Sequence, residues 1–323
     1  MANVAEPIGA PVVKAQALSE AVAFIAMAGF FAVAPAFIYP VFLMKALCFA
    51  LFALAFNLLI GYVGLLSFGH ALYFGWAAYV SAHAAKVWHL TPELAILAGT
   101  ATAAGLGLVA GALAIRRQGI YFAMITLALA QMMYFFAVQA PFTGGEDGIQ
   151  AVPRGYLFGI LDLSDTTRMY FTVFAIFIAS FLLIYRIIHS PFGEVLKAIR
   201  ENENRAISLG YKTERYKLVA FVLSTTLAGL AGATKAIVFQ LASLTDVHWT
   251  MSGEVVLMTL VGGLGTIFGP VVGATIIVAM QTYFASFGEW VTVITGLIFV
   301  VCVLAFRRGI VGEIGAWWGR ARR

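Results

Sequence analysis

Residues 41–60 read VFLMKALCFALFALAFNLLI, an apolar run whose one charged side chain is Lys45. About twenty residues in an α-helix extend roughly 30 Å, the thickness of the hydrocarbon core of a bilayer. The 323-residue chain as a whole has the same character, because 62% of its residues are hydrophobic and 11% are charged. Soluble domains carry about 25% charged residues. The composition therefore excludes a soluble globular protein and predicts one embedded in lipid.

The length of the apolar runs decides between the two kinds of membrane fold. In lipid every backbone N–H and C=O must be paired within the protein, which leaves helices or a closed barrel. Barrel strands alternate polar and apolar residues, whereas this chain stays apolar for about 20 residues at a time. We therefore predict an all-α fold, a polytopic transmembrane helical bundle of about ten spans (eight to ten). The predicted spans cover residues 21–39, 41–60, 68–85, 94–115, 120–140, 169–188, 217–240, 255–263, 271–287 and 291–306.

Basic residues gather on one side of this predicted topology. That side holds Lys14, Arg116 with Arg117, the segment 186–217 and the tail 307–323, together 15 of the 20 Lys and Arg residues. Since cytoplasmic loops are enriched in Lys and Arg, we expect both termini in the cytoplasm. The chain then divides into a cytoplasmic N-terminal segment, a transmembrane domain and a basic cytoplasmic tail, which cover residues 1–20, 21–306 and 307–323. The N-terminus lacks the basic region and cleavage site of a signal peptide, so the first span is expected to be retained.

No Asp, Glu, Lys or Arg falls at the centre of a predicted span. Lys45, Lys235 and Glu254 lie within about one or two turns of a predicted end, where long basic side chains can reach the interface. Glu254 is shorter, so two roles stay open: structural pairing with Lys45 or Lys235, and lining of a path through the protein. Proton- and sodium-coupled pumps usually need an ionisable group deep in the membrane. The pattern therefore indicates that energy for transport would come from elsewhere.

Residues 190–217 read SPFGEVLKAIRENENRAISLGYKTERYK and are far more polar than their surroundings. Ser190 and Asn202 each fit the N-cap of a short helix. Glu201 and Arg205 stand four residues apart in the order that stabilises a helix. A plain solvated connector would need only about four residues. We therefore predict two amphipathic helices that form a docking surface for another protein.

The sequence contains a weak internal repeat that is rich in glycine. Residues 59–69 read LIGYVGLLSFG and residues 260–269 read LVGGLGTIFG, so that Gly61 corresponds to Gly262. Paired glycine-interrupted segments are typical of the substrate path of a transporter, although small residues also serve plain helix packing. The residues that we assign to a translocation path are Gly61, Gly64, Ser67, Gly69, Glu254, Gly262, Gly265, Thr266 and Gly269.

The remaining polar features indicate structure rather than chemistry. Cys48 and Cys302 lie inside apolar runs, and the five histidines are not spaced as metal ligands. The loop TGGEDG at residues 143–148 is turn-forming, and its acids do not fit a calcium-binding EF-hand. No motif for hydrolysing nucleotides, esters or peptides is present. We therefore expect neither an enzyme nor a bound metal.

Four stretches together carry a family resemblance. They are NLLIGYVGLLSFGHALYFG (57–75), TGGEDGI (143–149), GEVLKAIRENENRAISLG (193–210) and EVVLMTLVGGLGTIFGPVVGA (254–274). In this order, within residues 41–306, they resemble the LivM-type permeases, which are subunits of ABC importers for branched-chain amino acids. The resemblance implies that residues 193–210 form the coupling segment that sits in a cleft of an ATPase. The residues so assigned to ATPase coupling are Gly193, Glu194, Arg200, Glu201, Asn202, Asn204, Arg205, Ala206 and Gly210.

The same resemblance implies a function and a set of partners. The chain would be a multi-pass protein of the bacterial inner membrane that moves amino acids from periplasm to cytoplasm, and the resemblance implies branched-chain ones (Leu, Ile and Val). It would work with a LivH-type permease, two cytoplasmic ATPase subunits that bind ATP and magnesium, and a periplasmic binding protein. This chain itself would bind no cofactor and no nucleic acid. Importers of urea or short amides share this type of permease and stay an alternative, as does an ion-coupled secondary transporter.

Overall fold

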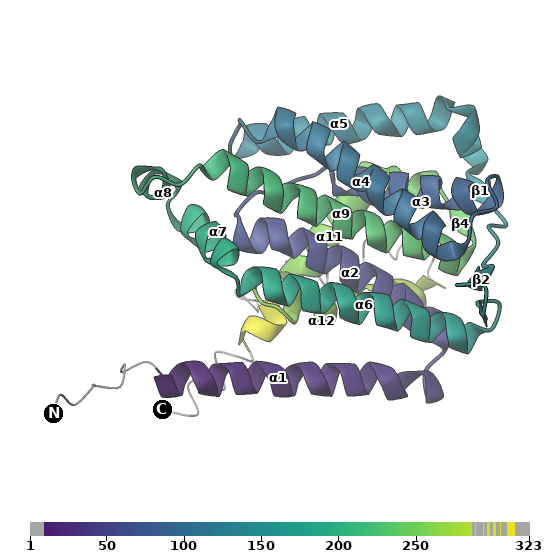
Figure 1. Ribbon diagram of the computed structural model, residues 1–323, viewed down its shortest axis with the longest axis horizontal. Coiled ribbons are helices and arrows are strands. Elements are labelled where there is room, and N and C mark those ends of the chain that lie inside the picture. The colour runs from purple at the N-terminus through teal and green to yellow at the C-terminus, as the bar shows by residue number, and fades with distance from the viewer. Residues whose placement is uncertain are drawn as a thin grey trace.

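Long helices make up most of the molecule (Figure 1). The computed structural model describes residues 10–285, 288, 293, 296, 297, 300, 301, 304 and 309–313, with side chains from Glu20 onward. The long helices of this part of the chain are α1 (Ala10–Val33), α2 (Pro40–Tyr62), α3 (His70–Lys86), α4 (Pro92–Ala114), α5 (Ile120–Gln139), α6 (Thr166–Ile188) and α9 (Thr213–Phe239). The predicted all-α, polytopic architecture is confirmed.

Five of these helices, α2, α4, α5, α6 and α9, are long and apolar enough to cross a membrane. Helix α3 has 17 residues. Residues 20–36, which continue α1 into the short helix η1 (Ala34–Ala36), and helix α12 (Gly269–Tyr283) form shorter apolar helices. Nine predicted spans each overlap a helix, whereas the tenth, 291–306, lies mostly outside the described residues. The number of ten crossings therefore stays a prediction.

Burial separates the central helices from the peripheral ones. In α2, 89% of the most apolar stretch of 18 residues is buried inside the molecule, and in α9 the share is 72%. The corresponding shares in α4, α5 and α6 are 39%, 28% and 33%. A helix that is apolar on every side is typical of a bundle core, whereas a peripheral apolar face is suited to lipid. Helices α2 and α9 thus form the core together with α3, most of whose residues are buried.

Glycines bring α4 and α9 into backbone contact with α3. A Cβ atom on Gly232 of α9 would lie 2.7 Å from the carbonyl carbon of Phe74 in α3. A Cβ atom on Gly99 of α4 would lie 3.2 Å from the carbonyl carbon of Ala77, one turn further along α3. Small residues at helix contacts are the usual means of tight packing in membranes. Helices α3, α4 and α9 are therefore packed too closely for larger residues at these positions.

One end of the bundle, the strand end, carries short strands and turns (Figure 1). Strand β1 (Ile149–Gln150) pairs with β4 (Leu241–Ala242), and β2 (Tyr156–Leu157) pairs with β3 (Leu161–Asp162). The TGGEDG loop forms turns, as predicted, through the short helices η2 (Pro141–Thr143) and η3 (Gly145–Asp147). The β1–β4 pair joins the loop after α5 to the segment after α9.

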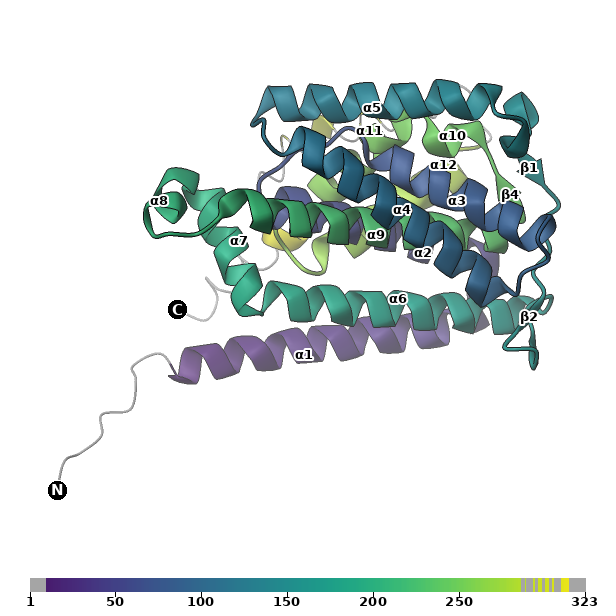
Figure 2. The ribbon, with the colours of Figure 1, turned by 45° about the horizontal axis from the view of Figure 1, so that its top comes forward.

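The opposite end, the α8 end, carries the two short helices α7 (Pro191–Glu201) and α8 (Glu203–Ser208). They project beyond the long helices, as Figure 2 shows. Helix α1 begins at this same end of the molecule (Figure 1). The predicted pair of short helices in the segment 190–217 is confirmed, and so is the break between them at Asn202.

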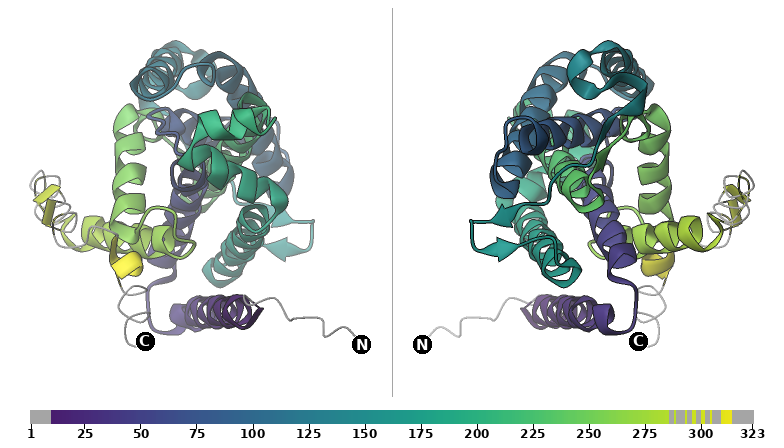
Figure 3. Two further views of the ribbon diagram at one scale, coloured as in Figure 1. Left: turned by 90° about the vertical axis from the view of Figure 1, so that its left-hand side faces the viewer. Right: turned by 90° about the vertical axis from the view of Figure 1, so that its right-hand side faces the viewer.

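Helices α11 (Trp249–Gly262) and α12 are oblique to the bundle. Figure 3 looks along the long helices, so that α1 and α6 are seen end-on while α11 and α12 are seen from the side. Helix α11 has 14 residues, which extend only about 21 Å. The short helix α10 (Leu244–Val247) precedes it and packs against Gly75 of α3. The predicted eighth span, 255–263, begins six residues later than α11, because the sequence did not reveal the short helix α10 and the break that follows it.

Candidate functional site

The two glycine segments meet in space. Gly61 lies on the last turn of α2, and Gly265 lies in the connection between α11 and α12. A Cβ atom on Gly61 would lie 2.8 Å from Gly265 N, closer than real side-chain carbons come to a backbone atom. The two similar glycine segments are therefore in contact, and we call this contact the glycine junction (Gly61, Gly64 and Gly265).

Asn57 binds the two segments together. Its Nδ2 donates to Thr266 O at 2.9 Å, and its Oδ1 accepts from Gly265 N at 3.0 Å. Asn57 is 2% exposed, and a buried amide of this kind is stabilised only when its donors and acceptors are paired. Asn57 belongs to the first stretch that carries the family resemblance but was not predicted as a site residue. The signal that could have found it is a lone amide in an otherwise apolar run.

The second glycine segment is held by its own hydrogen bonds. Thr266 Oγ1 donates to Gly263 O at 2.7 Å and accepts from Gly269 N at 3.1 Å. A Cβ atom on Gly269 would lie 2.8 Å from Gly262 O, so α11 and α12 cross here with their backbones in contact. The residues predicted in this segment therefore form one compact turn at the α8 end.

Arg200 connects α7 to the glycine junction. Its Nη1 donates a hydrogen bond to Gly61 O. Gly64 has a positive φ of 82°, and a Cβ atom there would lie 3.0 Å from Arg200 Cγ. A Cβ atom on Gly265 would lie 3.2 Å from Arg200 Nη1. The structure thus brings together a predicted coupling residue and three predicted path residues, which the sequence treated as separate sets.

Ser67 and Gly69, the remaining predicted path residues of the first segment, lie elsewhere. Gly69 N donates to Ser67 Oγ at 3.2 Å, in the turn that begins α3. A Cβ atom on Gly69 would lie 2.7 Å from Thr126 O, and Phe68 N donates to Thr126 Oγ1 at 3.2 Å. The turn that contains these two residues therefore packs against α5 and does not contribute to the glycine junction.

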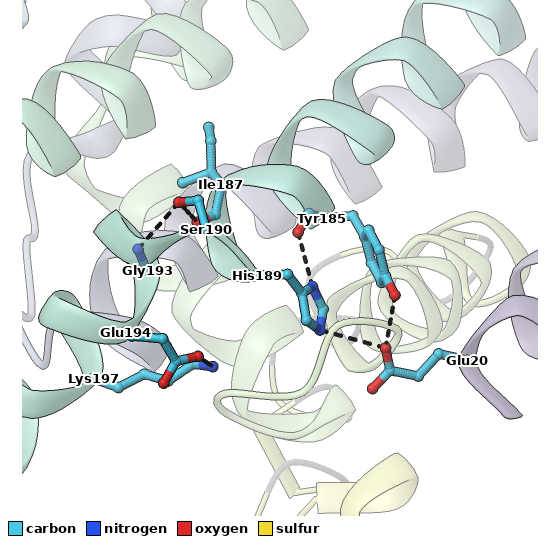
Figure 4. Close-up of polar contacts among 8 residues, drawn as sticks. All are labelled: Glu20, Tyr185, Ile187, His189, Ser190, Gly193, Glu194 and Lys197. Carbon is cyan, nitrogen blue, oxygen red and sulfur yellow. Dashed lines mark hydrogen bonds and ion pairs between the residues drawn. The ribbon is translucent and has the colours of Figure 1, made fainter. Parts of the chain in front are cut away.

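The turn between α6 and α7 is tightly specified, as Figure 4 shows. Ser190 Oγ accepts from Gly193 N at 3.3 Å, which confirms Ser190 as the N-cap. Gly193 is buried, and a Cβ atom there would lie 2.6 Å from Ile187 O. Glu20 of α1 accepts from the Tyr185 hydroxyl at 3.0 Å and lies 3.5 Å from His189 Nε2. Gly193 therefore serves this turn and offers no surface for docking.

The second short helix is capped as predicted but anchored differently. Asn202 Oδ1 accepts from Arg205 N at 3.0 Å. The predicted helical pairing of Glu201 with Arg205 is wrong, because Asn202 has an extended backbone and separates the two residues onto different helices. The anchor is Glu203, whose Oε2 accepts from Lys217 Nζ at 2.5 Å and from Gln118 Nε2 at 2.8 Å. Helix α8 is thereby fixed to α9 and to the loop before α5.

The outer surface of α8 is a mixed polar and apolar tip. Ala206 is 2% exposed and packs inward. Ile207 and Leu209 are apolar yet 52% and 69% exposed. The other exposed residues of the tip are Glu201, Asn202, Asn204, Arg205, Ser208 and Gly210, the last with a positive φ of 90°. Beside it, Phe192, Val195, Tyr211 and Tyr216 line a groove with Glu194 at its edge.

Glu254 lies away from the glycine junction, near the other end of α11. Glu254 forms no ion pair with Lys45 or Lys235, and its Oε2 accepts from Gln281 Nε2 at 3.0 Å. Lys235 forms an ion pair with Asp246, whose side chain is 1% exposed. Gly75 allows this arrangement, because α10 can then approach α3 closely enough to bury Asp246.

A protein-family model matches the part of the chain that forms this site. The model, described as the permease component of the branched-chain amino acid transport system, matches residues 39–303, which contain every element of the glycine junction and of α7 and α8. The chain belongs to this family. It is a transporter permease component and not an enzyme, as predicted.

Curated relatives of this permease have the same character. LivM of Salmonella typhimurium, a high-affinity branched-chain amino acid transport permease, is 26% identical over 291 residues, which cover 81% of this chain and 67% of the relative. LivM of Escherichia coli is 25% identical with the same coverage. A probable LivH permease of Methanocaldococcus jannaschii is 29% identical over 44% of this chain and 46% of its own length. No solved structure matches the chain.

Proposed function

We propose that this permease is a membrane subunit of an ABC importer that carries branched-chain amino acids from the periplasm to the cytoplasm. Family membership and the similarity to two LivM proteins support the substrate class. The observation that carries the mechanism is the hydrogen bond from Arg200 to Gly61 O. This bond joins α7, which lies outside the bundle, directly to the last turn of helix α2.

The proposed mechanism is mechanical. ATP-driven closure of two ATPase subunits would move the α8 tip, in which the apolar Ile207 and Leu209 are exposed. Helix α7 would pass the motion to the glycine junction through Arg200. Asn57 joins α2 to the α11–α12 connection, so both glycine segments would move together. A shift of this kind would rock α11 and α12 against the core and open the path.

The proposed topology follows the distribution of charge. The α8 end would face the cytoplasm, because α7, α8 and the first two turns of α9 carry Lys197, Arg200, Arg205, Arg215 and Lys217. Both termini would be cytoplasmic, with about ten spans of the inner membrane. The units would be an N-terminal segment (1–20), a permease domain (21–306) that contains the coupling segment (190–217), and a basic tail (307–323).

The proposed assembly has four kinds of partner. A LivH-type permease would pair with this chain in the membrane, and two ATPase subunits would dock on the α8 tips of the two permeases. These ATPases would bind ATP and magnesium, and this chain would bind neither. A periplasmic binding protein would deliver the solute at the strand end. The similarity of this chain to both LivM and LivH proteins supports such a pair of related permeases.

The docking proposal is tested at the α8 tip with a variant that leaves the fold intact. Leu209→Ser replaces an apolar side chain on a residue that is 69% exposed, so little packing is lost. We expect the variant to insert normally but to lose co-purification of the ATPase subunits. Leu182→Ser, at a site that is 47% exposed on α6 within the bundle, is the matched control and should retain them. Normal ATPase binding by Leu209→Ser would contradict the proposed docking surface.

The substrate proposal is tested by uptake into proteoliposomes that contain the complete importer. Labelled leucine should be accumulated when the loaded binding protein and ATP are present. Labelled urea and acetamide should not compete with leucine. Uptake of urea in preference to leucine would move this permease to the amide importers, with the mechanism unchanged.

A further inference from the structure

Four charged side chains and an amide converge near the strand end of the bundle. They come from five helices and comprise Lys45 (α2), Lys235 (α9), Asp246 (α10), Glu254 (α11) and Gln281 (α12). Lys45 lies within electrostatic range of Lys235, Glu254 and Asp246, because α2 packs against α9, α11 and α12. We call these five residues the charged cluster. Charged groups inside a membrane domain are costly and mark function more often than structure.

One pair within the charged cluster is complete. Lys235 Nζ forms an ion pair with Asp246 Oδ1, and Ser243 Oγ donates to Asp246 Oδ2 at 3.3 Å. The Lys235 side chain is 13% exposed and lies 5.9 Å from the centre of the Phe74 ring. Each charge of this pair is thus compensated, so the pair needs no ligand and supports the fold of α10 against α9.

The other two charges are not compensated in this way. Glu254 is half-buried and has a single hydrogen-bond partner in the described part of the chain, Gln281 Nε2 at 3.0 Å. Lys45 is also half-buried, and no residue from Glu20 to Ala285 accepts a hydrogen bond from its ammonium group. The two charges attract each other without forming an ion pair within 4.0 Å. Each therefore keeps free hydrogen-bonding capacity in a half-buried position.

We propose that Lys45 and Glu254 hold the two charged ends of a zwitterionic α-amino acid as it passes through the permease. The Lys45 ammonium group would donate to the carboxylate of the solute, and the Glu254 carboxylate would accept from its ammonium group. This site rests on the proposed function, because it supplies recognition for the amino acid that the importer carries. A neutral solute such as urea has no use for two opposite charges.

The helices that carry the site also carry the glycine junction. Lys45 and Asn57 are both on α2, and twelve residues of helix separate them by about 18 Å. Glu254 is on α11, which ends at the connection that contains Gly265. Gln281, which orients Glu254, is on α12, which begins at that same connection. A movement of the glycine junction therefore changes the separation of the two charges that would hold the solute.

The test uses the complete importer in proteoliposomes and compares Lys45→Met and Glu254→Gln with the wild type. Uptake of leucine per ATP hydrolysed should fall roughly 10- to 100-fold in each variant, the range for losing a hydrogen bond to a charged group. Stimulation of ATP hydrolysis by the loaded binding protein should stay within about twofold, because docking and coupling lie elsewhere. Lys86→Met is the control, since Lys86 is an exposed lysine at the strand end that donates to Gln150 O.

A double variant separates this site from a plain neutralising pair. If Lys45 and Glu254 only balanced each other, Lys45→Met with Glu254→Gln would recover transport, because removing both members of a pair is often harmless. We expect the double variant to be as poor as the worse single one, or poorer. Unchanged uptake per ATP in both single variants, or recovery in the double variant, would overturn the site alone. Wild-type protein that hydrolyses ATP without moving any amino acid would refute the proposed function, and the site with it.

Discussion

At the scale of single residues, the proposed mechanism depends most on Asn57 and Gly61. Both lie on the last turns of α2, and both act on the distant segment at Gly265 and Thr266. The glycine pattern of that segment was visible in the sequence. The role of Asn57 was not, because a lone amide in an apolar run has no periodicity that would reveal its partner. Only the fold brings its amide to two backbone groups on another helix.

Asn57→Leu is expected to destabilise the permease. The change leaves Gly265 N and Thr266 O without their partner, and each unpaired buried group costs about 1–3 kcal/mol. We expect a lower midpoint of thermal unfolding in detergent. Gln139→Leu is the control, because the Gln139 side chain is exposed and makes no hydrogen bond in the described structure. Equal midpoints for the two variants would show that the Asn57 bonds contribute nothing.

Gly61→Ala is expected to reduce transport even though alanine is small. Its Cβ atom would lie 2.8 Å from Gly265 N, so the two glycine segments must separate. Gly105→Ala on α4 is the matched control, because a Cβ atom there meets nothing within 4 Å. Alanine also favours a helix by about 1 kcal/mol over glycine. Leucine uptake, measured at equal protein levels in the membrane, should fall only in Gly61→Ala.

At the scale of elements, the sequence predicted the helices well and their contacts poorly. Local rules found the caps at Ser190 and Asn202, because capping depends on side chains two or three residues away. The predicted pairing of Glu201 with Arg205 failed for a related reason, since the second cap ends the first helix between them. The inward direction of Arg200 depends on a carbonyl group in α2. No local pattern could have predicted that contact.

Arg200→Ala is expected to separate docking from coupling. The variant loses the hydrogen bond to Gly61 O but keeps the exposed α8 tip. We expect ATPase subunits to co-purify normally while stimulation of ATP hydrolysis by the loaded binding protein is lost. Arg215→Ala is the control, because Arg215 is exposed on the first turn of α9 and its side chain makes no hydrogen bond or ion pair in the described structure. Full stimulation in Arg200→Ala would contradict the proposed link.

At the scale of the whole molecule, apolar length predicted the architecture. Nine predicted spans overlap helices, since lipid requires each run to close its own backbone hydrogen bonds. The arrangement of those helices was beyond the sequence, because it depends on which glycines meet which backbones. The prediction that no charge lies at a span centre also has a structural counterpart. The charged cluster belongs to five helix segments near one end of the bundle and needs the fold to assemble it.

In the proposed mechanism ATP, and no ion gradient, drives this permease. The decisive experiment is leucine uptake into proteoliposomes that contain the complete importer, with ATP and an imposed proton gradient supplied separately. We expect uptake with enclosed ATP that persists when a protonophore abolishes the gradient, and no uptake without ATP. Accumulation of leucine in ATP-free vesicles under a proton gradient alone would show that an ion gradient drives transport and would refute the proposed mechanism.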